Sequence, residues 1–287
     1  MRVHNQTGST LTKRDREHTL KNLVQSLRQA NMAVRIENIN SKHIERYISM
    51  KQEAGISLRT LQNQMAHIRT ELRAMGRDKL ADSDRLSCSA LGISGANRDG
   101  THQALSQAQY TEVLEQAQAL HPGFAAALQL QRELGLRMRE AIQSVDSLKS
   151  WERALQRGHR VHILHGTKGG RARDTMANDP QKALQAVKAA IEAAKANGGR
   201  LIPSASLQGA ARAYGRLCEK VGMTGKHASH ALRCAYAQER FTMHLEQLGE
   251  RREALAATSL DLGHGDGRGT YVAQVYLKNA AEELSKV

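Results

Sequence analysis

The sequence predicts a mainly α-helical protein with one small β-hairpin, organised as two domains. Apolar residues recur at three- and four-residue spacing over most of the chain, as on helices that bury one face. Alternation typical of strands occurs only on the two sides of a glycine-rich turn, within residues 160–177. Segment 77–104, which separates two helical regions, is rich in Asp, Ser, Gly and Asn and is typical of a linker.

The N-terminal region is expected to form a bundle of three helices behind a polar arm, residues 1–11. Thr12 is predicted to cap the first helix, because its hydroxyl can accept a hydrogen bond from a free amide of the first turn. Asn40 or Ser41 can cap the second helix in the same way, and Ser57 the third. The residues expected to face the core of this bundle are Leu20, Leu23, Val24, Leu27, Ile44, Ile48, Leu61, Met65, Ile68 and Leu72.

These patterns divide the chain into a helical domain at 12–80, a linker at 81–104 and a larger domain at 105–287. A chain of 287 residues is long enough for each domain to bury a core. The larger domain is expected to be helical except for the hairpin. Its predicted helices cover residues 107–120, 124–135, 182–196, 206–222, 227–249 and 251–263.

Both halves of the chain are basic. The formal net charge is +14 and the isoelectric point is about 10.0. Residues 1–100 hold 17 basic and 10 acidic side chains, and the remainder holds 25 and 18, so the excess is not confined to one tail. This distribution favours contact with a polyanion, double-stranded DNA above all, whose binding weakens steeply with salt. A generically basic protein is the alternative.

Cysteine content and hydropathy suggest the cellular setting. The three cysteines, Cys88, Cys218 and Cys234, are widely spaced, which favours a reducing cytosol over a disulfide framework. His230 and Cys234 lie four apart on an expected helix, but one such pair is too few for a metal site. No apolar run is long enough for a membrane span, and the N-terminus lacks the apolar core of a secretion signal. We therefore expect a cytoplasmic, nucleoid-associated protein without metal, cofactor or membrane contact.

Six residues in the larger domain suit a site that holds a phosphodiester. Attack on phosphorus by a side-chain oxygen needs a nucleophile, cationic groups for the charge that develops, a proton acceptor and a proton donor for the leaving oxygen. Arginine can grip two phosphate oxygens at once, and histidine exchanges protons near neutral pH. The candidates are Arg137, Lys168, His230, Arg233, His264 and Tyr276.

In type and order, this series resembles the catalytic domain of the tyrosine recombinases, the phage-integrase family. The resemblance covers roughly residues 105–287, and the three-helix unit before it resembles the SAM-like DNA-binding domain of these enzymes. A generic helical bundle is the alternative for that unit. Its basic surface residues, each of which suits either a DNA-facing or a solvated surface, are Lys42, Arg46, Lys51, Arg59, Arg69 and Arg73.

The resemblance implies a role for each residue that would contact the phosphate. Arg137 and Arg233 would hold its two non-bridging oxygens, with Glu140 orienting Arg137. His230, which shares a helix face with Arg233, would donate a hydrogen bond or take a proton. His227 is the competing histidine, but the sequence His-x-Leu-Arg favours His230. The alternative for Arg137 is a surface arginine after a turn. The alternative for the histidines is a structural role only.

The resemblance also implies that Lys168, at the hairpin tip, protonates the departing 5′ oxygen, and that His264 hydrogen-bonds the scissile phosphate. The nucleophile departs from the family pattern, which places it about nine residues after that histidine. Tyr271 and Tyr276 stand seven and twelve residues after His264. If residues 265–269 form an enlarged loop, the apolar neighbours of Tyr276 match the family motif, and Tyr276 is the predicted nucleophile. Tyr271 remains the alternative.

The function implied is that of a site-specific recombinase, which cleaves and rejoins DNA through a 3′-phosphotyrosyl bond for a mobile element, as a homotetramer on DNA. The tail after Tyr276 is expected to be short and helical. Two alternatives stay open. A type IB topoisomerase-like enzyme would reseal the strand that it cut. A DNA-binding protein that has lost the reaction would explain the displaced tyrosine.

Overall fold

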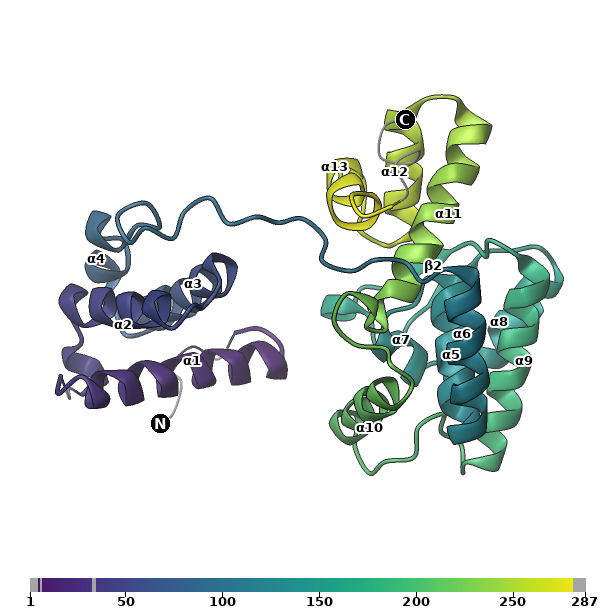
Figure 1. Cartoon of the computed structure of the whole chain (residues 1–287), viewed down its shortest axis with the longest axis horizontal. Helices are drawn as coiled ribbons and strands as arrows, with labels where there is room; N and C mark the ends of the chain where they lie inside the picture. Colours follow the sequence, from purple (N-terminus) through teal and green to yellow (C-terminus); the bar gives the residue numbers. More distant parts are fainter. Residues whose placement is uncertain (1–4, 6, 33–34, 281–287) are drawn as a thin grey trace. The chain divides into compact units, whose positions relative to one another are not determined.

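A computed structural model of the chain describes residues 5, 7–32 and 35–280. Most of the predicted C-terminal tail and part of the predicted N-terminal arm lie outside these residues. The chain forms two compact units, Met1–Arg98 and Asp99–Val287 (Figure 1). Within the described residues the fold is mostly helical with one two-stranded antiparallel sheet, as predicted. None of the helices described is long and apolar enough to cross a bilayer.

The N-terminal unit contains the three predicted helices and a short fourth one. Its first helix begins earlier than predicted, because Ser9, not Thr12, is the cap: the Ser9 hydroxyl accepts a hydrogen bond from the Thr12 amide. Asn40 and Ser57 cap the next two helices, as expected. The helices are α1 (Thr10–Gln29), α2 (Ser41–Glu53), α3 (Leu58–Ala74) and α4 (Asp78–Ala81).

The core of this unit is built from the predicted apolar stripes. All of those residues are buried except Val24, which is half-buried. Leu86, Leu91 and Ile93 also belong to the core, although they stand in the segment predicted as linker. Their isolated positions among polar residues give no periodic signal, so only the packing reveals that the unit extends past α4.

The C-terminal unit is centred on α6, which packs between α5 and α9 and against α11 (Figure 1). Helix α6 is buried on nearly all sides, which explains its run of alanine and leucine. Helix α11 packs against α12 as well as against α6. The long helices are α5 (Gln107–Leu120), α6 (Pro122–Leu134), α9 (Pro180–Ala196), α10 (Leu207–Lys220), α11 (His230–Leu248) and α12 (Arg251–Asp261).

The predicted hairpin is present. Strand β1 (Val161–Ile163) pairs antiparallel with β2 (Arg173–Thr175), with Ile163 opposite Arg173. A short 3-10 turn, Lys168–Gly170, lies in the connection. Both strands bury alternate residues, and this places the Arg173 side chain inside the protein.

Several short elements were not predicted from the sequence. They are α7 (Met138–Ile142), α8 (Leu148–Gln156), α13 (Gly269–Val272) and a π turn, Ala273–Leu277. Each is too short to show helical periodicity clearly and is held by tertiary contacts. In α8, for example, the Trp151 indole donates a hydrogen bond to the His162 carbonyl, 2.8 Å away.

Two predicted helix bounds differ from the structure. Helix α11 begins at His230, and His227 belongs to a separate 3-10 turn, Gly225–His227, so the two histidines do not share a helix face. After Tyr276, Leu277 closes the π turn and residues 278–280 form a turn and a bend rather than a helix. The remainder of that tail lies outside the described residues.

Candidate active site

The end of α6 positions Arg137. Gly135 adopts a left-handed conformation, with φ of 59°, and the chain reverses so that Arg137 becomes the residue that precedes α7. Glu140 caps this helix: one carboxylate oxygen accepts from the Arg137 backbone amide at 2.8 Å, and the other accepts from the Arg137 guanidinium at 2.7 Å. Glu140 therefore orients Arg137, as the resemblance implied.

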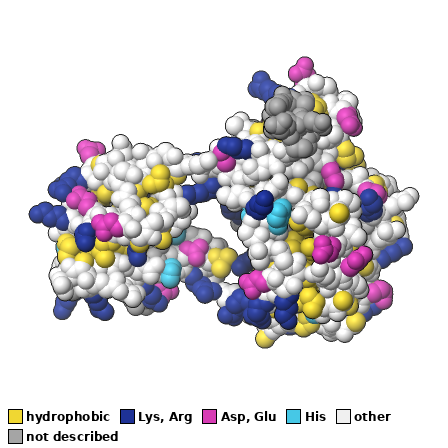
Figure 2. All heavy atoms as spheres, in the orientation of Figure 1, with side chains coloured by type: hydrophobic (Ala, Val, Ile, Leu, Met, Phe, Trp, Pro, Cys, Tyr) yellow, Lys and Arg dark blue, Asp and Glu magenta, His cyan; other side chains and the backbone are white. Residues whose placement is uncertain are grey.

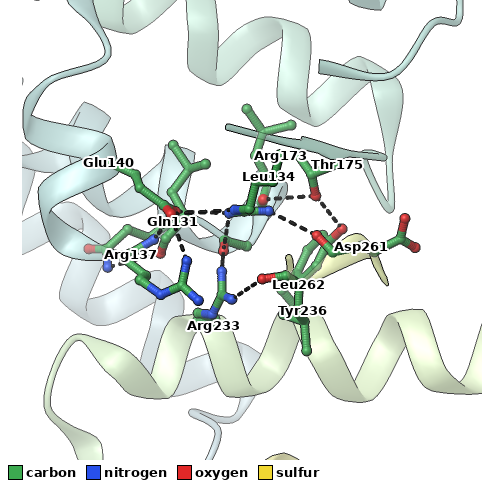
Figure 3. A network of polar contacts seen from close by, with 12 residues as sticks. Gln131, Leu134, Arg137, Glu140, Arg173, Thr175, Arg233, Tyr236, Asp261 and Leu262 are labelled. Carbon is green, nitrogen blue, oxygen red and sulfur yellow. Dashed lines mark hydrogen bonds and ion pairs between the residues drawn. The ribbon is translucent and has the colours of Figure 1, made fainter. Parts of the chain in front are cut away.

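Glu140 is fully buried and also pairs with Arg173, whose guanidinium lies 2.9 Å from the carboxylate (Figure 3). Burial by itself raises the pKa of Glu140. The charges of Arg173, Arg233 and Arg137 outweigh that effect and hold the pKa at about 2. The carboxylate therefore stays ionised in a site that is otherwise cationic.

Arg173 is a buried component of the site that was not among the residues predicted from the sequence. Its guanidinium donates to Glu140 and to the carbonyls of Gly135 and Asp261. It thereby ties β2 to the ends of α6 and α12. The sequence marked it only weakly: strand alternation puts residues 173 and 175 on one face, but all three strand residues are polar, so nothing identified that face as the buried one.

Arg233 lies on the first turn of α11 and has no exposed surface. Its guanidinium donates to the carbonyls of Gly135 and Leu262, and its Nε donates to the Tyr276 hydroxyl at 3.2 Å. Arg173 and Arg233 thus share the Gly135 carbonyl (Figure 3). Three of the five N–H groups of Arg233 are used in these contacts.

The Tyr276 hydroxyl lies between Arg233 and His264. His264 Nε2 is 3.1 Å from this hydroxyl, and the His230 ring centroid is 5.7 Å from that of Tyr276. Burial, reinforced by the charges of Arg233 and Arg137, lowers the pKa of both histidines to about 3. Both imidazoles are therefore neutral at physiological pH, so each can donate one hydrogen bond and accept another.

The two candidate tyrosines occupy the same region but differ in their contacts. Tyr276, in the π turn, is 2% exposed, whereas Tyr271, on α13, is 37% exposed. The Tyr271 ring lies 4.8 Å from that of His264 and 6.3 Å from that of Tyr276. The loop after α12, in which Gly263 adopts a φ of 67°, places the His264 ring beside both tyrosine rings.

A cleft of about 1030 Å³ brings the predicted residues together. Arg233 lies beneath the cleft, against Tyr276. Lys168 is exposed in the turn between the strands and lines the cleft from the hairpin side. The other predicted residues that line it are Arg137, His230, His264 and Tyr276.

The charge of the cleft suits an anionic ligand. Two acidic residues, Asp174 and Asp261, line it beside a larger number of basic ones. Lys and Arg side chains also appear on the visible faces of both units (Figure 2). The basic residues that line the cleft besides Arg137 and Lys168 are Arg160, Arg171, Arg173 and Arg268.

Asp261 forms a second buried ionic cluster at the edge of the cleft. Its carboxylate lies 2.9 Å from Arg240 and 2.8 Å from His244, and it also pairs with Arg160. Burial by itself raises the pKa of Asp261, but the hydrogen bond from His244 and the two arginines lower it below its usual value. This cluster fixes the end of α12, whose last carbonyls receive Arg173 and Arg233.

The chain matches two family models and several solved structures. The family model described as "Integrase" matches residues 92–239, and the one described as "Phage integrase, N-terminal" matches residues 1–81. A structure of the Tn1549 transposon integrase in complex with transposon right end DNA has a TM-score of 0.63 and 16% identity, covering 99% of this chain and 94% of the other. A lambda integrase dimer bound to a core site has a TM-score of 0.56 and 16% identity, covering 97% and 92%. The search of curated proteins gave no match.

Proposed function

This chain belongs to the phage integrase family of tyrosine recombinases, and from that membership we propose that it cleaves and rejoins DNA through a 3′-phosphotyrosyl intermediate. The observation that carries the proposal is the position of the Tyr276 hydroxyl. It contacts Arg233 and His264 in a basic cleft large enough for a sugar–phosphate segment. We assign its role to the integration or excision of a mobile element, with the nucleoid as the place of action.

In the cleavage step, the Tyr276 oxygen attacks phosphorus and the bond from phosphorus to the 5′ oxygen breaks. His264 accepts the tyrosine proton, because its Nε2 atom lies 3.1 Å from the hydroxyl and the negative phosphate bound in the cleft opposes the arginine charges that lower the pKa of this histidine. Arg137 and Arg233 stabilise the charge that develops on the non-bridging oxygens. His230 donates a hydrogen bond to the same phosphate.

Lys168 gives a proton to the departing 5′ oxygen. Its exposed position in the turn between β1 and β2 allows the ammonium to move toward a bound duplex. A 5′ hydroxyl of a partner strand then attacks the phosphotyrosine and returns the tyrosine. The energy of the broken phosphodiester is kept in the intermediate, so the resealing step draws on no nucleotide.

The N-terminal unit supplies a second DNA-binding surface in this proposal: the predicted helical domain, 12–80, together with the core residues up to Ile93 from the segment predicted as linker. Of the six basic surface residues named from the sequence, three form hydrogen bonds or ion pairs within the protein: Arg46 with Glu53, Arg69 with the Leu86 carbonyl and Arg73 with Asp82. Lys42 and Arg59 are exposed and are the better candidates for phosphate contacts. Four copies would then assemble on two duplexes.

The test is covalent capture of DNA. The binding site is first selected from random-sequence duplexes with the Tyr276→Phe protein, and a nicked form of it is then incubated with wild type, Tyr276→Phe and Tyr271→Phe. Wild type and Tyr271→Phe are expected to give a protein–DNA adduct on a denaturing gel, and Tyr276→Phe none. If Tyr271→Phe alone abolishes the adduct, the nucleophile is Tyr271. If wild type binds the site without an adduct, the chain is a non-catalytic DNA-binding protein.

A second assay separates strand exchange from simple relaxation. Two labelled duplexes of different length carry the selected site, and the recombinase is expected to join the arms of one to the other. A protein that relaxes supercoiled DNA and never joins the two duplexes would instead act as a type IB topoisomerase-like enzyme.

A further inference from the structure

The first residues of the C-terminal unit lie on the segment that carries Tyr276. We call residues 99–103 the strap and residues 274–279 the nucleophile segment. The Gly100 amide donates to the Gln274 carbonyl at 3.0 Å, and the Asn279 side-chain amide donates to the Gly100 carbonyl at 2.7 Å. The two segments are thus hydrogen-bonded on both sides of Tyr276.

Side-chain contacts of Asp99 strengthen this pairing. One Asp99 carboxylate oxygen accepts from the Gln274 amide at 3.2 Å, and the other pairs with the Lys278 ammonium. At the far end of the strap, the backbone amide of Gln103 donates to the backbone carbonyl of Lys226 at 2.9 Å, shortly before the start of α11. The strap therefore joins the nucleophile segment to the turn before His230.

Gly100 is required for this close approach. A Cβ atom at Gly100 would lie 1.9 Å from the Val275 carbonyl oxygen, far inside contact distance. Its φ is not in the left-handed region, so the requirement is for space between two backbones and not for an unusual conformation. Any larger residue must push the strap away from the nucleophile segment.

His102 extends the strap to the catalytic histidine. Its ring centroid lies 5.1 Å from that of His230, which in turn lies 5.7 Å from that of Tyr276. The Nδ1 atom of His102 is buried and has no hydrogen-bond partner among the residues that the structure describes. His102 thus contacts the His230 ring directly and limits the positions open to it.

We propose that the strap is a positioning element for cleavage, which holds the Tyr276 turn in its reactive place and orients His230 through His102. A five-residue π turn cannot hold itself in water, because so short a helix does not recover the entropy of its own formation. Reactivity nevertheless requires the nucleophile to be fixed within a fraction of an ångström.

The position of the strap in the chain adds a regulatory consequence. It begins directly at the boundary between the two units, at Asp99. A displacement of the connection between the units therefore reaches the nucleophile segment through one run of hydrogen bonds. This inference rests on the proposed function, because it assigns a catalytic purpose to the contact, but the contact itself can be tested without activity.

The first measurement is hydrogen–deuterium exchange of the full-length protein without DNA. The amides of Gly100 and Gln103 are expected to exchange slowly in wild type, and Gly100→Ala is expected to expose them together with residues 274–279. Gly215→Ala is the matched control, because a Cβ at this helical glycine meets nothing within 4 Å. Fast exchange of both amides in wild type would show that the strap is not docked and would overturn the inference.

The second measurement separates binding from chemistry on the selected nicked duplex. Gly100→Ala and His102→Phe are expected to lower the single-turnover rate of adduct formation about 10- to 100-fold. The DNA dissociation constant should change less than about twofold, because no phosphate contact is removed. Asp99→Asn keeps an acceptor for Gln274 and loses the charge that pairs with Lys278. Its rate of adduct formation should lie between the rates of these variants and that of wild type.

The outcomes are distinguishable. Release of the strap in Gly100→Ala without a change in adduct rate overturns the positioning role and leaves the proposed function intact. A wild-type protein that binds the duplex and forms no adduct overturns the proposed function, and with it the catalytic purpose of the strap. A protected strap, a slow Gly100→Ala variant and a normal Gly215→Ala control together support the inference.

Discussion

At the centre of the site, one carboxylate organises three arginines. Glu140 caps α7, pairs with the buried Arg173 and sets the direction of Arg137. Without this negative charge, Arg173 and Arg233 would be buried next to each other as like charges. The arrangement keeps Arg137 directed at the cleft while the other two guanidinium groups hold the backbone around it.

Replacement of Glu140 by Gln tests this role. We expect Glu140→Gln to lower the free energy of unfolding by about 3–5 kcal/mol, because the buried Arg173 loses its counter-ion. Unfolding is followed through Trp151, the single tryptophan, which lies in the C-terminal unit. Glu192→Gln, which removes an exposed pair with Lys195, should cost less than about 1 kcal/mol. Equal losses in the two variants would contradict the assignment.

The histidines beside Tyr276 predict a pH dependence of stability. The pKa of His264 is about 3 in the folded protein, below the ordinary value of 6.5. Between these values the unfolded chain binds a proton that the folded protein does not, so stability falls as pH is lowered through this window. The loss is at most about 1.4 kcal/mol for each pH unit and each proton.

His264→Asn should therefore lose less stability than wild type when pH is lowered from 7 to 5. Urea unfolding followed through Trp151 measures the free energy of unfolding of each protein at both pH values. The contact with Tyr276 that the variant loses is missing at both pH values, so it cancels in the difference between them. His159→Asn, at an exposed histidine, is the control. The same pH-dependent loss in His264→Asn and wild type would show that His264 does not remain neutral in the folded protein.

At the scale of elements, the site is assembled from the ends of helices rather than from their middles. The ends of α6 and α12 present the carbonyls that accept from Arg173 and Arg233, and α11 begins at His230. Helix ends leave carbonyl groups without partners inside the helix, and here buried arginines satisfy them. The hairpin contributes Arg173 from one strand and Lys168 from its turn.

Replacement of Gly135 by Ala tests how tightly the end of α6 packs against α11. In Gly135→Ala, the new Cβ would meet the Tyr236 ring at 2.3 Å in addition to adopting a left-handed φ. We expect a loss of about 2–5 kcal/mol in the free energy of unfolding, from the backbone conformation and the overpacking together. Gly198→Ala, which has a similar φ of 62° and no atom within 4 Å, should lose only about 1–2 kcal/mol. A similar loss in both variants would show that the ring can move aside at little cost.

For the whole molecule, the basic charge of both units predicts that DNA affinity depends steeply on salt. Each lysine that meets a phosphate adds about one unit to the slope of log K against log salt. We expect Lys42→Gln to lower this slope by about 1 and to leave the rate of adduct formation at saturating protein unchanged. Lys195→Gln, on α9 and paired with Glu192, is the matched control and should keep the wild-type slope. An unchanged slope for Lys42→Gln would remove this residue from the DNA surface.

The sequence by itself determined the fold class, most of the long helices and the hairpin. Apolar spacing and cap residues such as Asn40 and Ser57 are local signals, and burial of one helix face follows from them directly. The order of Arg137, Lys168, His230, Arg233, His264 and Tyr276 along the chain also pointed to the family, because chemistry restricts which residue types can serve.

Only the tertiary structure decided how these residues meet. The Tyr276 hydroxyl contacts both Arg233 and His264, and a loop of uncertain length hid that contact from the sequence. Arg173 and the strap at residues 99–103 gave little or no periodic signal. Their partners lie far away along the chain, and such contacts are fixed by packing in space rather than by any local pattern.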